Sequence, residues 1–315
     1  MAKLKLSILD QSPISAGGDR AQGIAQAIIE TVALARHCDR LGYHRYWLAE
    51  HHGTLALAGN SPEILIARIA SVTEHMRIGA GGILLNLYPP SKVAENFQTL
   101  EALFPGRIDL GLGRVAGTGP GGDQTLDIKA FPRQVRELLV ILDQHKAPGP
   151  EVWVLGSSPR SAINAAELGL PYSYGHFINQ TDGVEAMCAY RQSFHLSKFL
   201  AGPKGSLAAF VICAETQEEA DILALSREGY MVSQRTGIPG PIPAPETVRD
   251  ANFTTPQRQM MAHIRSQSII GPPGKVHDQL IALADAHGID EIVVVTITHA
   301  YEARRRSYEL LAGAF

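Results

Sequence analysis

Short apolar runs alternate with longer amphipathic stretches along most of this chain. Eight runs rich in branched or apolar residues have the length of β-strands, at 4–9, 45–49, 77–85, 107–112, 152–156, 171–176, 207–214 and 292–297. Strands that alternate with helices form parallel sheets, either open and doubly wound or closed into a barrel. The count of eight favours the α/β fold known as the (β/α)8 TIM barrel. We expect residues 1–315 to form a single domain.

The stretches between the strands carry the signatures of helices. In 21–41, the residues Ile24, Ile28 and Val32 recur at helical spacing, and Gly42 supplies a stop signal. Further stripes or N-terminal signals occur at 60–63, 91–103, 131–144, 158–159, 216–219 and 272–273. Each of these helices is expected to cover the outside of the sheet.

Residues 229–268 interrupt the alternation. Within them, proline occupies every second position from 239 to 245, which excludes a regular helix or strand there. We therefore expect an excursion between the seventh and eighth strands. It either folds over the mouth of the barrel or is a solvated linker without a role.

The second strand ends in Glu50, His51 and His52, at the rim where barrel enzymes keep their chemistry. Adjacent residues on a strand point to opposite faces, so at most one of the two imidazoles faces a pocket. A metal site built from both is therefore awkward, and we expect no metal. The alternative is one surface histidine and one core histidine whose ring is hydrogen-bonded.

The fifth strand is followed by Ser157, Ser158 and, one helical turn later, Ser161. Hydroxyl groups and free backbone N–H groups at a helix N-terminus are a typical phosphate site. Arg114, at the end of the fourth strand, supplies a guanidinium that grips phosphate with two hydrogen bonds. The pattern indicates a phosphorylated cofactor. The alternative is a serine-capped helix and a surface arginine.

Composition and charge exclude several classes of protein. The 315 residues carry a net charge of −3 without a basic stripe, which argues against a nucleic-acid partner. The cysteines Cys38, Cys188 and Cys213 lack metal-ligand spacing, so we expect a reducing compartment and no disulfide framework. The chain starts without a secretory segment and has no apolar stretch that could span a bilayer. We expect a cytoplasmic protein without a membrane partner.

Two glycine-rich segments, 111–116 and 117–122, match a dinucleotide-binding fingerprint by letters. Neither opens a helix, because glycine and proline continue to Gly122, and this argues against a Rossmann dehydrogenase. No Gly-x-Ser-x-Gly segment is present, which argues against a serine hydrolase of the elbow type.

Several short segments, each weak by itself, follow one another in a specific order. They are LSILDQSP at 6–13, GY at 42–43 with WLAEHH at 47–52, GAGGILL at 79–85, KVAENF at 92–97, PGRIDLGLGR at 105–114, LGSS at 155–158 and RSYELL at 306–311. On these segments the chain resembles the bacterial luciferase-like flavin monooxygenases nearly from end to end.

The resemblance implies a barrel that binds FMN with the isoalloxazine across its mouth. It places the FMN phosphate at Arg114, Ser157, Ser158 and Ser161, in agreement with the phosphate site expected from the residues themselves. In the family the end of the third strand passes under the flavin, often through a cis peptide, which corresponds here to Gly81-Gly82. Residues without a Cβ let a flat ring come close to the backbone.

The resemblance also implies a catalytic motif. His51 matches the catalytic histidine of the luciferases, His52 follows it there too, and Glu50 is expected to fix the tautomer of His51. The implied chemistry has two components: a separate NAD(P)H:flavin reductase supplies reduced FMN, which reacts with molecular oxygen to form a C4a-hydroperoxide. A small-molecule substrate and a homodimer are expected on the same basis.

The chain also departs from the family pattern. Many relatives carry proline at the position of Asn86, and segments 115–130 and 145–151 are shorter than usual. Because these positions border the pocket, substrate size and lid geometry stay open. The nearest subgroup includes tailoring oxygenases of polyketide antibiotic pathways, so the resemblance extends to epoxide formation on an aromatic polyketide. An F420-dependent hydride-transfer oxidoreductase and a non-catalytic flavin-binding protein are the alternatives.

Overall fold

The computed structural model describes residues 4–115, 127–144 and 148–315. Its parallel barrel consists of β1 (Lys5–Asp10), β2 (Arg45–Leu48), β3 (Arg77–Leu84), β4 (Ile108–Gly113), β5 (Glu151–Gly156), β6 (Tyr172–Gly175), β7 (Gly205–Cys213) and β9 (Glu291–Val295). Neighbours pair in the order β6-β5-β4-β3-β2-β1-β9-β7, and pairing of β6 with β7 closes the ring. The predicted eight-stranded TIM barrel is confirmed, and each predicted strand lies within two residues of an observed one.

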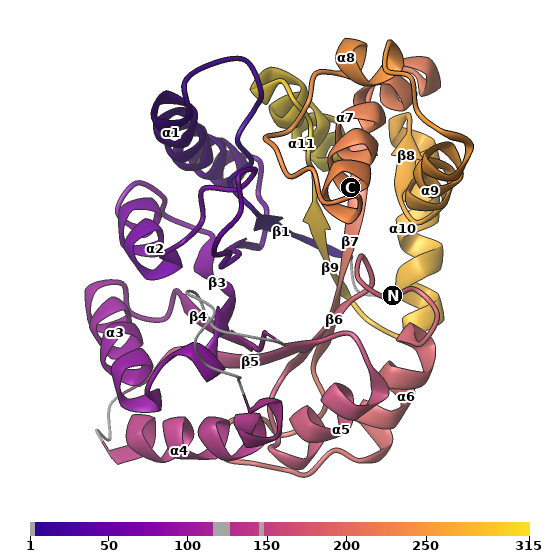
Figure 1. Ribbon diagram of the computed structural model, residues 1–315. Coiled ribbons are helices and arrows are strands. Elements are labelled where there is room, and N and C mark those ends of the chain that lie inside the picture. The colour runs from indigo at the N-terminus through magenta and orange to yellow at the C-terminus, as the bar shows by residue number, and fades with distance from the viewer. Residues whose placement is uncertain (1–3, 116–126, 145–147) are drawn as a thin grey trace.

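Helices surround the barrel in Figure 1. They are α1 (Arg20–Arg40), α2 (Pro62–Ala70), α3 (Pro90–Leu103), α4 (Phe131–Gln144), α5 (Pro159–Glu167), α6 (Gly183–Gln192), α7 (Gln217–Arg235), α8 (Pro245–Arg249), α9 (Thr255–Ser266), α10 (Pro273–His287) and α11 (Tyr301–Ala314), with 3-10 turns η1 (Leu85–Leu87) and η2 (Ile128–Ala130). The helices expected from apolar stripes and start signals are all present. Gly288 ends α10 with φ of 62°, the left-handed conformation that a glycine stop provides.

Sequence patterns did not identify every element. The short strand β8 (Ile269–Gly271) pairs with Val211–Cys213 of β7, just after the predicted excursion. Helices α6, α8, α9 and α11 were not predicted either, and α8 and α9 lie within the expected excursion. In α11, Arg304 is buried and forms an ion pair with Asp10 of β1 at 2.9 Å, so this face of the helix carries a charge where a stripe analysis expects an apolar residue.

The excursion between β7 and β9 packs onto the mouth of the barrel. The N–H of Ile242 donates to the carbonyl of Ile14 at 2.7 Å, and the N–H of Ala16 donates to the carbonyl of Ile242 at 2.8 Å. The side chain of Ile242 is fully buried in the same apolar cluster as Trp47 and Phe210. The segment is therefore part of the packed structure, and the alternative of a solvated linker is wrong.

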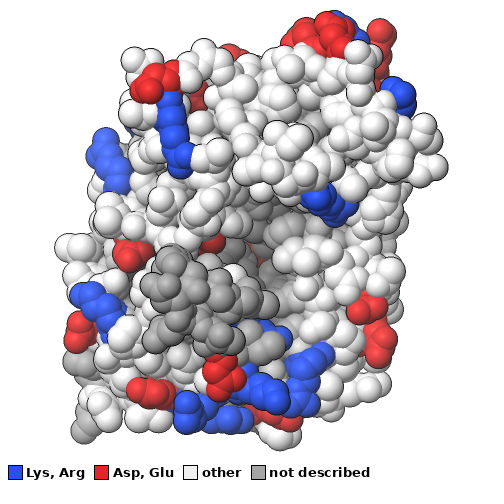
Figure 2. All heavy atoms as spheres, viewed as in Figure 1, with Lys and Arg blue, Asp and Glu red and all other residues white. Residues whose placement is uncertain are grey.

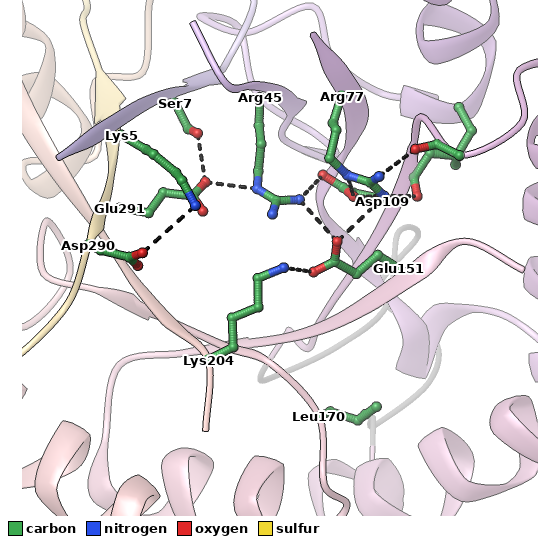
Figure 3. A network of polar contacts seen from close by, with 12 residues as sticks. Lys5, Ser7, Arg45, Arg77, Asp109, Glu151, Leu170, Lys204, Asp290 and Glu291 are labelled. Atoms are coloured by element: carbon green, nitrogen blue, oxygen red, sulfur yellow. Dashed lines mark hydrogen bonds and ion pairs between the residues drawn. The ribbon is translucent and has the colours of Figure 1, made fainter. Parts of the chain in front are cut away.

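A network of charges closes the opposite end of the barrel, near the amino ends of the strands (Figure 3). Arg45 reaches Asp109 at 2.7 Å and Glu291 at 2.8 Å, and Arg77 also binds Asp109. Burial works against the charge of Arg45, but Asp109, Glu291 and Glu151 outweigh it and raise the pKa of the guanidinium. We call this network of Arg45, Arg77, Asp109, Glu151 and Glu291 the charged floor. Because it fills the barrel near the amino ends of the strands, a cavity has room only at their carboxyl ends.

Disulfides, membrane-spanning helices and metal clusters are the marks of other classes of protein, and the described part of the chain shows none of the three. Cys38, Cys188 and Cys213 are all free thiols, and Cys38 and Cys213 are buried. Among the described helices, none combines the length and the apolar character needed to cross a membrane. Within the same residues, no cluster of three or more His, Cys, Asp or Glu side chains is arranged to hold a metal ion.

Candidate active site

A cavity of about 310 Å³ opens at the carboxyl ends of the strands. Figure 2 shows the mouth as a hollow near the centre of this face. Apart from His52, every residue that the sequence nominated for the site lines this cavity: Glu50, His51, Gly81, Gly82, Arg114, Ser157, Ser158 and Ser161. The barrel therefore brings together residues from the ends of β2, β3, β4 and β5 that lie as far as 111 positions apart.

His51 and His52 take different places, as the alternation of side chains predicts. His51 lines the cavity, and its backbone N–H donates to the carbonyl of Gly59 at 2.8 Å. The Nε2 atom of His51 is buried and has no hydrogen-bond partner within the described protein. Burial lowers the pKa of His51, while the neighbouring Glu50 opposes that shift. The imidazole is therefore neutral at neutral pH, and its Nε2 is buried without a hydrogen-bond partner in the described part of the chain.

Glu50 does not bind His51, and the expectation that it fixes the His51 tautomer is wrong. Its Oε1 lies 2.6 Å from Nε2 of His52 and also accepts the hydroxyl of Tyr88, while its Oε2 accepts the N–H of Leu84 at 2.8 Å. The reason is the two-residue period of an extended chain, because Glu50 and His52 share one side and His51 points to the other. Glu50 thus ties the end of β2 to the end of β3.

The end of β3 runs along the cavity without side chains. The peptide bond Gly81-Gly82 is cis, as the family resemblance implied. A Cβ on Gly81 would lie 2.8 Å from Cδ1 of Leu9 and 2.9 Å from Cβ of Trp47. A Cβ on Gly82 would lie 2.6 Å from the carbonyl oxygen of Gly111. Only glycine fits at both positions, which leaves a flat stretch of backbone in the cavity wall.

The N-terminus of α5 also lines the cavity, through Ser157, Ser158 and Ser161. Ser158 is the N-cap, and Ser158 and Ser161 form a reciprocal capping box. The Ser161 hydroxyl donates to the carbonyl of Ser158 at 2.7 Å and lies 2.9 Å from the hydroxyl of Tyr172. Arg114 is exposed and lines the same cavity. A serine-capped helix can also be a phosphate site, so the two interpretations are compatible. The hydroxyl proton of Ser161, however, is already donated to the carbonyl of Ser158 within the cap.

Several residues of the cavity wall were not singled out by sequence reasoning. They include Gln11, Trp47, Phe131, Asn164, Phe177 and Ile178. Gln11 could have been found, because it lies at the end of β1 beside the other strand ends. The aromatic and aliphatic side chains carry no signal of this kind, because in a sequence they are indistinguishable from core residues.

Comparisons with known proteins bear on this cavity. The family model described as "Luciferase-like monooxygenase" matches residues 4–144. The chain is 41% identical to the Bacillus subtilis (strain 168) "Uncharacterized protein YwcH", over 99% of each chain. It is 34% identical to the "N-acetyl-S-alkylcysteine monooxygenase" of the same strain, over 99% of this chain and 98% of the relative.

Solved structures share the fold over the whole chain. Apo-MsnO8 is similar with a TM-score of 0.90 and 37% identity, over 99% of this chain and 98% of that one. The oxygenating constituent of 3,6-diketocamphane monooxygenase from Pseudomonas putida, a type II Baeyer-Villiger monooxygenase in complex with FMN, has a TM-score of 0.69. At 20% identity, over 98% of this chain and 97% of that one, this second likeness concerns the fold alone.

Proposed function

The chain belongs to the luciferase-like monooxygenase family, and from this membership we propose that it is the oxygenating component of a two-component, FMN-dependent monooxygenase. Members of the family use reduced FMN. One observation carries the proposal: a single cavity is lined by His51, by the N-terminus of α5 and by Arg114. The imidazole suits the isoalloxazine ring of FMN, and the anion site suits its phosphate group.

The residues present fit FMN. The hydroxyls of Ser157 and Ser158 at the start of α5 suit a phosphate, since a helix N-terminus attracts negative charge. Arg114 adds a cation on the same cavity wall. Ser161 supports this end indirectly, because its hydroxyl holds the cap. The bare backbone at Gly81 and Gly82 suits the face of a flat ring.

When bound as reduced FMN, the cofactor activates molecular oxygen and supplies one oxygen atom to the substrate. In this proposal, the task of His51 is to hold a proton on its imidazole or to accept one there. The lowered pKa of His51 supports this role, because a neutral imidazole has one donor and one acceptor nitrogen. We assign His51 as the catalytic residue.

Glu50 and His52 have positioning roles in this proposal. The carboxylate of Glu50 holds His52 and the N–H of Leu84, so it sets the path of the chain on both sides of the cavity mouth. His51 lies between Glu50 and His52 in the chain, and its backbone is bound to Gly59. These bonds limit the directions that the His51 ring can take.

Apolar side chains around the remaining wall exclude water from the reacting centre. Trp47, Leu155 and Phe177 line the cavity, and exclusion of water protects a reactive oxygen species from wasteful breakdown. Aromatic lining also suits a flat apolar molecule. We therefore propose a small organic substrate such as an aromatic polyketide of an antibiotic pathway, with epoxidation as one reaction of this type.

The family membership supports a separate NAD(P)H:flavin reductase as the source of reduced FMN. We also propose that the chain acts as a homodimer and that residues 1–315 form a single domain. Support for the single domain comes from the sheet, whose strands from β1 to β9 join in one hydrogen-bonded array.

The test is a stopped-flow experiment. The protein, loaded with reduced FMN without oxygen, is mixed with oxygenated buffer while the flavin spectrum is recorded. We expect the absorbance of oxidised FMN to return more slowly with the protein than with free reduced FMN. When an accepted substrate is added to the protein, the absorbance should return faster than without substrate. A substrate panel should include aromatic polyketides and a thioether, because one relative is named as an alkylcysteine monooxygenase. Stable turnover that needs F420 and no oxygen would overturn the proposal.

A further inference from the structure

Asn86 lies in the turn η1 and makes a two-point contact with the loop that follows β4. Its Nδ2 donates to the carbonyl of Val115 at 2.8 Å, and its Oδ1 accepts the N–H of Val115 at 3.1 Å. We infer that Asn86 is a positioning residue for the cofactor phosphate, acting through the neighbouring Arg114. This inference rests on the proposed function and gives a role to a residue that is not among those lining the cavity.

The contact extends the pairing of β3 with β4, with a side-chain amide in place of backbone groups. The last backbone pair of this ladder joins Leu84 to Gly113. Two residues further on in each chain, the next pair would join residue 86 to Val115, but β3 has already turned away into η1. The side-chain amide of Asn86 replaces the missing backbone groups. Arg114 is therefore held on both sides, by the ladder at Gly113 and by the amide at Val115.

The turn η1, which carries Asn86, is itself held in place. Leu85 is fully buried in the main apolar cluster. On one side of it, the N–H of Leu84 donates to Glu50; on the other, the hydroxyl of Tyr88 donates to the same carboxylate. The turn that carries Asn86 is therefore tied to the end of β2, so the amide can impose its position on the neighbouring loop.

The chemistry of this contact is specific to a primary amide. One group must donate to a carbonyl while another accepts an N–H, and the side chains of Asn and Gln provide both. Aspartate could accept the N–H of Val115 but would place a second oxygen against its carbonyl. The side chain of proline provides neither group.

The consequence for binding follows from the direction of Arg114. Arg114 lines the cavity that also contains Ser157 and Ser158, so its backbone position decides how well the guanidinium meets a phosphate at that end. Without Asn86 the guanidinium stays present, but the backbone that carries it loses the contact at Val115. The loss should appear as weaker binding of a phosphorylated flavin, while a flavin without phosphate is unaffected.

The experiment compares reduced FMN with reduced riboflavin, which lacks the phosphate. Dissociation constants are measured by anaerobic ultrafiltration for wild type, Asn86→Ala, Arg114→Ala and the double variant. Arg114→Ala should weaken FMN binding about ten- to hundredfold, and Asn86→Ala about five- to thirtyfold. Neither change should alter riboflavin binding by more than about twofold, and in the Arg114→Ala background Asn86→Ala should add less than about twofold.

Two further variants serve as controls. Asn86→Asp keeps the size of the side chain and should weaken FMN binding in the same direction, which keeps the test valid if the alanine variant folds poorly. Asn252→Ala changes an exposed asparagine and should leave both constants unchanged.

The possible outcomes are distinct. Equal weakening of FMN and riboflavin by Asn86→Ala, or an undiminished effect in the Arg114→Ala background, would overturn the inference and make Asn86 a general structural residue. Unchanged FMN affinity in Arg114→Ala alone would overturn the proposed phosphate site, and the inference would fail with it.

Discussion

The Nε1–H of Trp47 donates a 2.9 Å hydrogen bond to Oδ2 of Asp109, the same oxygen that accepts from Nη1 of Arg45 at 2.7 Å. Trp47 lines the cavity, whereas Arg45 belongs to the charged floor near the amino ends of the strands. The ring of Trp47 also packs edge-on against Trp153, with 5.3 Å between ring centroids. One buried carboxylate therefore joins the floor of the barrel to the wall of its active site.

Asp109→Asn should destabilise the fold strongly. Asparagine keeps the size of the side chain but leaves the guanidinium groups of Arg45 and Arg77 without their shared carboxylate, and breaking a buried ion pair costs about 3–5 kcal/mol. Urea unfolding measures the loss. The control is Asp290→Asn, because Asp290 pairs with Lys5 at 3.7 Å on the surface and should cost less than about 1 kcal/mol. Equal losses in the two variants would contradict a structural role for the floor.

His51→Ala should separate binding from chemistry. Reduced FMN should bind within about twofold of wild type, because the phosphate end of the cavity is untouched. With an accepted substrate, the rate of product formation should fall about 100-fold or more, the usual contribution of a positioned acid or base. More of the consumed oxygen should then appear as hydrogen peroxide, measured by a peroxidase-coupled dye. His277→Ala, on the surface of α10, is the control; a matching fall in FMN affinity in His51→Ala would make His51 a structural residue.

Gly82→Ala should damage the cavity wall. The added Cβ would lie 2.6 Å from the carbonyl oxygen of Gly111, a backbone atom that cannot rotate away. Overpacking of this kind costs about 1–3 kcal/mol, and displacement of the wall should weaken binding of reduced FMN. Thermal unfolding and anaerobic flavin binding measure the two effects. The control is Gly149→Ala, whose added methyl group has no atom within 4 Å and should change neither the thermal stability nor the flavin binding. A Gly82→Ala variant with the stability and flavin affinity of wild type would refute the close packing.

His176 should make the stability of the fold sensitive to acid. Burial, with a smaller contribution from His287, lowers the pKa of His176 to about 4, whereas an unfolded histidine titrates near 6.5. Between these values the unfolded chain binds more protons, so the stabilising contribution is complete above pH 6.5 and is lost as the pH falls toward 4. Allowing for solvent screening of a partly exposed ring, the loss at pH 4.5 is about 1–2 kcal/mol.

The check for His176 is urea unfolding of wild type and His176→Asn at pH 7 and pH 4.5. Carboxylates titrate in both proteins, so the difference between the two pH dependences isolates the histidine. The variant should lose less stability on acidification than wild type. Parallel losses would show that the ring is protonated as easily in the folded state as in the unfolded one.

Local patterns were sufficient for most of the architecture. Strand runs such as 77–85 and helix stripes such as 131–144 reappear as β3 and α4, because the period of apolar residues follows from the geometry of each element. The same reasoning indicated that at most one of His51 and His52 faces a pocket, and His51 is the one that lines the cavity. The strand β8 was missed because it has three residues, too few for a period, and its pairing partner lies on β7.

The sequence by itself determined the barrel, the rim on which the site lies, and the residue types gathered there: an imidazole, glycines without side chains, hydroxyls at a helix start and an arginine. Only the tertiary structure decided which of these groups meet. Glu50 pairs with His52, Tyr88 and Leu84, and Asn86 reaches Val115. Most of these partners are about 30 to 40 positions apart, and hydrogen bonds at such separations depend on how strands pack side by side, which no local period encodes.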